Sequence, residues 1–254
     1  MSLAIHDETA VGLHLTELHK LLRTSALILC VTCIFWSFFV SQVIHAWIDF
    51  LPLQTGPTNE NLSIYGPYDW LEVRWALVLV LGFTSLLPVL SIQLYRFSRS
   101  GLYSMERNWL TAVLTICTSI VPIAIIIVWV YVIPAIFDLA ESAGTIDGIG
   151  VSYDASAILS LALGASWILI VWAVTVVTIG LARLNGLVED SGTRFRYRIL
   201  AISTGSLVLL LPLEFDGLRL VIAFATAITA DAVSRNVPIV YPNWRDRVPD
   251  DSSV

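Results

Sequence analysis

The chain has 254 residues, of which 57% are hydrophobic and 13% are charged, and its formal net charge is −6. Soluble domains average about 45–50% apolar and about 25% charged residues, so the composition excludes an ordinary soluble domain and a disordered chain. The apolar runs carry apolar residues on every face, whereas barrel strands alternate apolar and polar residues, which excludes an outer-membrane barrel. We therefore predict an all-α integral membrane protein.

Long uncharged runs mark the predicted membrane helices, because a hydrocarbon core of about 30 Å needs about 20 apolar helical residues. Four runs reach that length, and they cover 25–47, 75–95, 108–137 and 155–182. The third run is so long that it must tilt, bend or project beyond the bilayer.

The C-terminal part has a different pattern, in which two shorter apolar runs, 199–213 and 218–230, flank Glu214 and Asp216. A single helix through both runs would place two carboxylates near the middle of the membrane, at a high energetic cost. We predict a hairpin of two short helices instead. The protein then has six transmembrane helices, of which the last two are short enough to thin the bilayer locally.

The basic residues predict the orientation. With a cytoplasmic N-terminus, all of the 14 Lys and Arg residues except Arg74 and Arg219 fall on the inner side. By the positive-inside rule, both termini are therefore cytoplasmic. We divide the chain into an amphipathic cytoplasmic segment that lies along the membrane surface (1–24), a six-helix transmembrane domain (25–233) and a flexible cytoplasmic tail (234–254).

Catalytic and cofactor chemistry have few candidate residues in this sequence. The four His residues avoid the middle of the spans, where haem ligands would lie, and neither a nucleotide loop nor a zinc-ligand spacing occurs. Cys30 and Cys33 have the spacing of a redox or metal motif, but a thiol inside an apolar helix usually packs as a small hydrophobe. We predict that the protein is not an enzyme and has no cofactor or metal.

Polar motifs lie on the predicted cytoplasmic side, before the first span and between the second and third. They read His-Leu-Thr-Glu-Leu at 14–18, Gln-Leu-Tyr-Arg-Phe at 93–97 and Gly-Leu-Tyr-Ser-Met-Glu-Arg at 101–107. Leu15 and Leu18 share one face of a helix. One interpretation makes Glu17 and Glu106 solvated anchors that pair with neighbouring basic residues.

In this order and on this side of the membrane, the motifs resemble the TatC family, the multispanning receptor subunit of the twin-arginine protein translocase. The resemblance extends over about residues 13–231 and is strongest at 13–22 and 67–107, where Pro88 matches a family proline. Six spans with both termini inside and a short final pair also match the family.

The resemblance implies a receptor in the plasma membrane of a prokaryote, which binds paired-arginine signal peptides of folded precursors for export driven by the proton-motive force. In the family, carboxylates that match Glu17 and Glu106 form the site. The expected signal-peptide-binding residues are Glu17, Glu106, Leu15, Leu18, Gln93, Phe97 and Arg107. The expected partners are signal peptides, small single-span subunits of the TatA/TatB type and the lipid bilayer in a homo- or hetero-oligomer, without nucleic acid.

The fourth span departs from the family pattern. The family has a Glu there that contacts its single-span partner, whereas this chain has Val174 and Thr175 near that position. We expect the partner contact to use Thr175 or another surface, together with Glu214 on the periplasmic side. Two other functions stay open. A secondary transporter for a small solute would need polar sites at the midplane, and a TatC-like scaffold would hold partners without receiving cargo.

Overall fold

The protein is described here by a computed structural model that covers residues 3–51, 62–63, 66–98, 104–144, 153–184 and 194–236. Its helices are α1 (Leu3–Ile48), α2 (Pro67–Ser98), α3 (Ser104–Ile127), α4 (Ile133–Gly144), α5 (Ala155–Leu184), α6 (Arg194–Leu210) and α7 (Arg219–Ser234). A π-helical turn, η1 (Val128–Val132), joins α3 to α4, and a 3-10 turn, η2 (Leu213–Phe215), lies between α6 and α7. The all-α class is confirmed.

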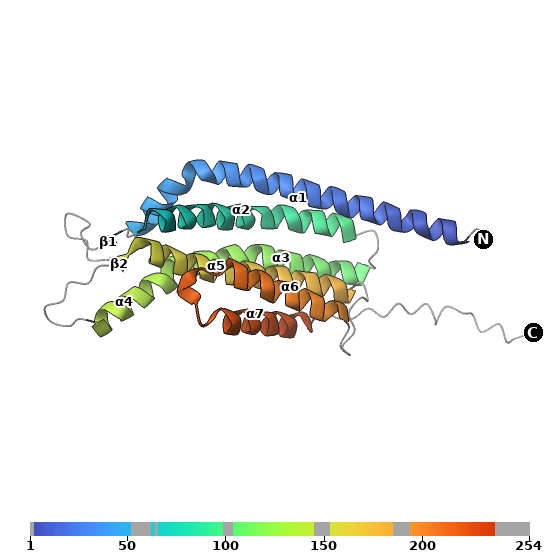
Figure 1. The fold of residues 1–254 in the computed structure, drawn as a ribbon. Coiled ribbons are helices and arrows are strands. Elements are labelled where there is room, and N and C mark those ends of the chain that lie inside the picture. Colours follow the sequence, from blue (N-terminus) through green and yellow to red (C-terminus); the bar gives the residue numbers. More distant parts are fainter. Residues whose placement is uncertain are drawn as a thin grey trace, which may run out of the picture.

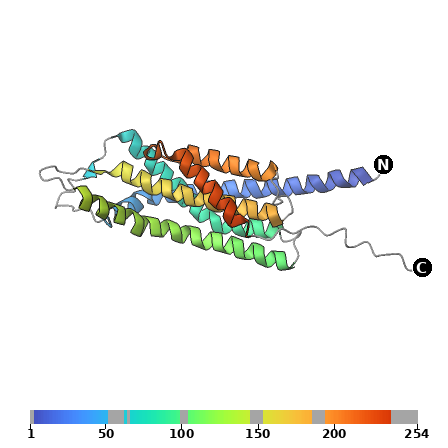
Figure 2. The ribbon, with the colours of Figure 1, turned by 90° about the horizontal axis from the view of Figure 1, so that it is seen from below.

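The helices form an elongated bundle, in which α5 is the central element (Figures 1 and 2). α5 packs against α2, α3, α6 and α7, whereas α1 packs against α2 at the edge. Accordingly, 61% of an apolar stretch of 18 residues in α5 is buried inside the protein. The corresponding share for α1 is 11%. The start of α1 and the end of α7 lie at the same end of the bundle (Figure 1).

Four helices are long and apolar enough to cross a membrane, and they cover His19–Ile48, Tyr68–Ser98, Arg107–Leu139 and Ala155–Arg183. These helices agree with the four long spans predicted from the sequence. The predicted C-terminal hairpin is also present, with 17 residues in α6 and 16 in α7. Helices of this length extend about 25 Å, less than a hydrocarbon core of about 30 Å. The six-span topology with cytoplasmic termini therefore stays a prediction.

The N-terminal helix differs from our prediction. We expected residues 1–24 to form a separate helix along the membrane surface, but α1 is one helix of 46 residues that continues through the expected boundary (Figure 1). Neither Gly nor Pro occurs between Leu21 and Leu27, so nothing there interrupts the backbone hydrogen bonds. The segment is therefore not separated from the first span by a break in the helix, whereas its position along the membrane surface stays a prediction.

Two short strands tie the connections together at the opposite end of the bundle. β1 (Leu62–Ser63) pairs in parallel with β2 (Tyr153–Asp154). Asp154 also caps α5, because its Oδ1 accepts hydrogen bonds from the backbone N–H of Ser156 at 2.9 Å and from its hydroxyl at 2.6 Å. The start of the central helix is thereby held to the connection between α1 and α2.

The third apolar run bends at η1. Ile133 donates its backbone N–H to the carbonyl five residues earlier, and the next residue, Pro134, has no N–H. The Trp129 carbonyl is thus left for another donor, and the Trp47 indole donates to it at 2.9 Å. Trp129 donates its own indole N–H to Ser166 Oγ at 2.8 Å. These bonds join α1, η1 and α5.

Small residues let other elements approach α5 closely. Ser156 and Ser160 are buried. A Cβ atom on Gly164 would lie 2.2 Å from the ring of Phe215 in η2. Because Gly164 lies nine residues into α5, the turn of the hairpin stops about 14 Å short of the start of α5.

We expect Gly164→Ala to lower the thermal midpoint of the purified protein in detergent, because the added methyl group would displace the Phe215 ring. Overpacking of this kind costs about 1–3 kcal/mol. Gly205→Ala in α6 is the matched control, since its added Cβ meets open space and Ala favours a helix. Equal midpoints for the two variants would contradict the close contact between η2 and α5.

Candidate functional site

The predicted site residues come from three helices that meet at one end of the bundle. Leu15, Glu17 and Leu18 lie in α1, Gln93 and Phe97 in the last two turns of α2, and Glu106 and Arg107 in the first turn of α3. Figure 1 shows the end of α2 near the start of α3, with α1 running past α2. The side chains of Leu15, Glu17, Leu18 and Glu106 lie outside the described residues.

Hydrogen bonds hold α1 and α2 in an antiparallel register. Ser25 donates its hydroxyl to Gln93 Oε1 at 2.9 Å, and the Trp36 indole donates to Ser85 Oγ, also at 2.9 Å. Gln93 therefore links the two helices. Glu17 lies eight residues before Ser25, about 12 Å along α1, whereas α2 extends only about 8 Å beyond Gln93. The backbone of Glu17 thus lies just past the end of α2.

Besides Gln93, two predicted site residues have described side chains at this end. Phe97 is 36% exposed, so its ring offers an apolar surface where α2 ends. Arg107 is partly buried, and its backbone carbonyl accepts a hydrogen bond from the Thr111 hydroxyl at 2.8 Å. An aromatic ring and a guanidinium therefore lie on the two helices that border the site.

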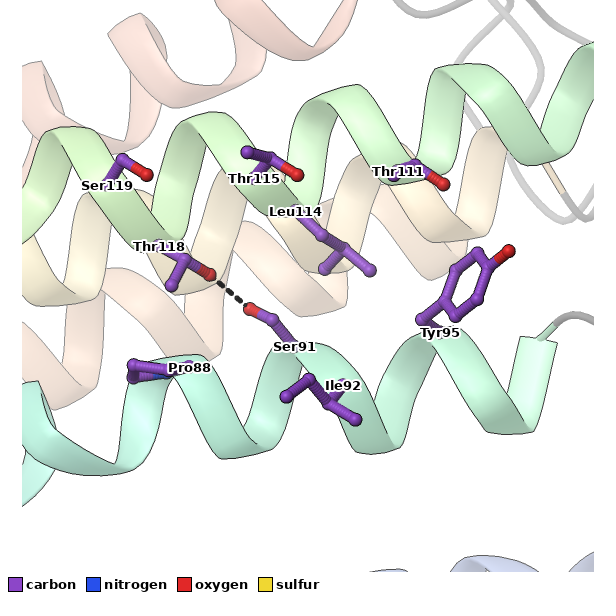
Figure 3. A pocket seen from close by; sticks show the side chains of 9 residues that line it. All are labelled: Pro88, Ser91, Ile92, Tyr95, Thr111, Leu114, Thr115, Thr118 and Ser119. Carbon is purple, nitrogen blue, oxygen red and sulfur yellow. Dashed lines mark hydrogen bonds between the residues drawn. The ribbon is translucent and has the colours of Figure 1, made fainter.

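A groove of about 300 Å³ lies between α2 and α3 and leads from this end toward the middle of the bundle (Figure 3). It is lined by Pro88, Ser91, Ile92, Tyr95, Thr111, Leu114, Thr115, Thr118 and Ser119. The hydroxyls of Ser91 and Thr118 are hydrogen-bonded to each other across it at 2.5 Å. Pro122 has no N–H, so the carbonyl of Thr118 also loses its usual helical donor.

The sequence does not predict this groove, because a groove depends on which faces of two helices meet. A local signal was present in α3, where Thr111, Thr115 and Ser119 recur at intervals of four residues. This interval puts three small hydroxyl side chains on one face of a helix. Without the position of α2, however, the face could not be assigned to a site.

The two residues predicted for partner contact lie in different surroundings. Glu214 is exposed in η2. Thr175 is 3% exposed, and its hydroxyl is hydrogen-bonded to that of Ser203 in α6 at 2.6 Å. It also lies 20 residues into α5, about 30 Å from the start of the helix. The hydroxyl of Thr175 is thus used inside the bundle, and a contact of Thr175 with a partner stays a prediction.

An ion cluster where α5, α6 and α7 meet was also missed. The buried Asp231 accepts hydrogen bonds from the guanidinium of Arg196 at both of its oxygens, with Nε–Oδ1 at 2.5 Å. Arg235 donates to the same carboxylate at 3.0 and 3.2 Å. From α5, Arg183 donates to the backbone carbonyl of Arg235 at 3.4 Å. In the sequence these arginines indicate only the orientation of the chain, and no local pattern marks Asp231 as their partner.

The cysteines are free thiols in the structure. Cys33 lies at the contact of α1 with α2, because a Cβ atom on Gly82 would come within 2.7 Å of its Sγ. Within the described part of the chain, no group of three or more His, Cys, Asp or Glu residues could hold a metal ion. The Cys30–Cys33 spacing thus coincides with a packing contact between two helices.

Four long apolar helices, a short helical hairpin and a grooved end define a multi-pass α-helical membrane protein. The sequence profile described as Sec-independent protein translocase protein (TatC) matches residues 13–212, and the chain belongs to the TatC family.

Solved structures agree with this fold, and both are crystal structures of the twin-arginine translocase receptor TatC. One has a TM-score of 0.61 at 18% sequence identity and covers 87% of this chain and 96% of its own. The other, in DDM, has a TM-score of 0.60 at 18% identity and covers 88% of this chain and 99% of its own. A search of curated proteins gives no match. The recognition of the family from its motifs is thus confirmed.

We expect Thr175→Val and Ser203→Ala to lower stability in a coupled manner, because each hydroxyl is the partner of the other. Hydrogen bonds between membrane helices contribute about 0.6 kcal/mol on average, up to about 1.7. A double-mutant cycle on the unfolding free energy in detergent measures the coupling. Thr178→Val is the control, since Thr178 bonds to a carbonyl of its own helix. Zero coupling would mean that the two hydroxyls do not interact.

Proposed function

We propose that this protein is the signal-peptide receptor of a twin-arginine translocase. It binds paired-arginine signal peptides of folded precursors at the cytoplasmic face of a prokaryotic plasma membrane, for export driven by the proton-motive force. The observation that carries the proposal is that α1 and α3 bring Glu17 and Glu106 to the same end of a TatC-family bundle. The distribution of basic residues supports the cytoplasmic location of that end.

Two carboxylates on different helices suit a motif of two consecutive arginines. A carboxylate accepts the planar guanidinium fork through two parallel hydrogen bonds. A lysine ammonium is a point charge and does not reproduce this geometry, which accounts for a preference for Arg over Lys. Arg107 lies directly after Glu106 in the chain and competes locally for the carboxylate. This competition weakens capture and makes it depend on both acids together.

The groove between α2 and α3 is the proposed binding surface for the apolar segment that follows the paired arginines. It opens beside Tyr95 and Thr111 (Figure 3), which lie two residues from Phe97 and about one turn from Arg107 respectively, so the site for the apolar segment adjoins the end of the bundle that carries the motif acids. The lining is mainly apolar, and the small side chains of Thr115 and Ser119 allow close approach of a second backbone.

Small single-span subunits of the TatA/TatB type are the proposed partners. The bond of the Thr175 hydroxyl inside the bundle favours a contact that uses another surface. The turn η2 is the proposed alternative, because the hairpin stops short of the start of α5 there and presents the exposed Glu214. This carboxylate would replace the fourth-span acid that other members of the family carry.

Site-specific crosslinking of the reconstituted protein to a twin-arginine precursor and to its twin-lysine variant tests the receptor. We expect crosslinks from positions near Glu17 and Glu106 with the arginine form only. A hydrogen bond to a charged group contributes about 1.5–3 kcal/mol, so Glu17→Ala with Glu106→Ala should weaken binding by at least about 100-fold.

The matched control removes two acids elsewhere, through Glu72→Ala and Asp138→Ala. Both lie toward the opposite end of the bundle and should leave crosslinking unchanged. Equal labelling by the arginine and lysine precursors would sink the receptor proposal, and so would full labelling of the Glu17 and Glu106 double variant.

Filling the groove should displace the apolar segment of the precursor. We expect Ser119→Phe to reduce, several-fold, the crosslinks between that segment and a probe at Ile92, because the new ring occupies the groove. Ile120→Phe is the control, since Ile120 is the next residue along α3 but does not line the groove. If both variants keep wild-type labelling at Ile92, the apolar segment binds elsewhere. This result would leave the receptor proposal intact, because the crosslinks near Glu17 and Glu106 test the capture of the arginines separately.

A further inference from the structure

A concentration of arginines lies where α5, α6 and α7 meet. The described residues of this region carry five guanidinium groups and one carboxylate: Arg183, Arg194, Arg196, Arg198, Arg235 and Asp231. Asp231 forms salt bridges with both Arg196 and Arg235, so one negative charge is shared by two positive ones. The described part of the cluster therefore has a large positive excess.

Three of these guanidinium groups are accessible from outside. Arg194 and Arg198 are exposed and lie four residues apart on one face of α6. The side chain of Arg235 is 59% exposed, although one edge donates to Asp231. The first turn of α6 adds the positive end of its helix dipole beside Arg194 and Arg198. An anion at this position would meet two arginine forks and a helix N-terminus.

The residues that continue this face of α6 are apolar and exposed. Phe195, Ile202 and Leu209 recur at intervals of seven residues and are 43%, 69% and 87% exposed. Arg198 lies between the first two of them on the same face. From Arg198 to Leu209 the helix extends about 16 Å, which is about half of a hydrocarbon core of about 30 Å. The stripe therefore has the length of one lipid leaflet.

Aromatic residues indicate the depth of the cluster in the membrane. Phe195 and Tyr197 alternate with the arginines at the start of α6, and Tyr197 is 60% exposed. Exposed aromatic rings beside basic residues are typical of the level of the lipid headgroups. The uncharged run begins directly after Arg198. The guanidinium groups thus lie at the boundary where lipid phosphates are found.

We propose that this face of α6 binds an anionic phospholipid, with Arg194 and Arg198 on the headgroup phosphate and an acyl chain along Phe195, Ile202 and Leu209. Guanidinium forks bind phosphate oxygens bidentately. A lipid headgroup matches the surface better than a free phosphate, because the charge and the apolar stripe are continuous.

Native mass spectrometry of the intact protein in detergent tests the proposal, with phosphatidylglycerol and phosphatidylcholine of identical acyl chains as probes. We expect preferential retention of phosphatidylglycerol. A basic residue at an anionic lipid surface contributes about five-fold in affinity, so Arg194→Gln with Arg198→Gln should weaken phosphatidylglycerol binding about 25-fold. Arg194→Lys with Arg198→Lys keeps the charge and should retain most of the binding, which separates loss of charge from loss of fold.

The matched control is Arg245→Gln with Arg247→Gln, which removes two arginines from the C-terminal tail and should leave lipid retention unchanged. Three results would overturn the proposal: equal retention of the two lipids, wild-type retention by the glutamine variant, and displacement of phosphatidylglycerol by millimolar inorganic phosphate, which would indicate a general anion site. Because the assay contains no signal peptide, its outcome is independent of the receptor function.

Discussion

The bond from the Trp47 indole to the Trp129 carbonyl is the contact on which the arrangement of the bundle depends. A bilayer core offers no water to hydrogen-bond a free backbone group, so each such group must find its partner inside the protein. The π-helical turn and Pro134 release one carbonyl, and the indole from α1 satisfies it. Because Trp129 then donates to Ser166, the bend between α3 and α4 is anchored to the central helix at the same point.

The central helix follows the same constraint with small side chains and hydroxyls. Gly164 admits the Phe215 ring, and Thr175 and Ser203 satisfy each other between α5 and α6. In water such hydroxyls could remain solvated, whereas in lipid their pairing selects the neighbouring helix. The short hairpin is thereby held against α5 at two levels, one near its turn and one nearer its open end. A fold with few intramembrane charges is thus specified by neutral hydrogen bonds and close packing.

The two halves of the bundle differ in the polar groups they carry. The motif acids belong to α1 and α3, whereas the ion cluster of Asp231 belongs to the hairpin and α5. In the proposed receptor, the first half captures the precursor and the second half contacts lipid headgroups. Arginines that orient the chain by the positive-inside rule would then also bind a ligand, since phosphate groups lie where the rule places basic residues.

The sequence alone determined the membrane class, the four long spans, the C-terminal hairpin and the family, because apolar length, polar interruptions and short motifs are local properties of the chain. It predicted a separate surface helix at 1–24, although the backbone of α1 has no interruption there. Only the tertiary structure decided that Thr175 is buried, that α2 and α3 enclose a groove, and that Asp231 joins two arginines across the hairpin. Each of these depends on which face of one helix meets another, and residues far apart in the sequence determine that choice.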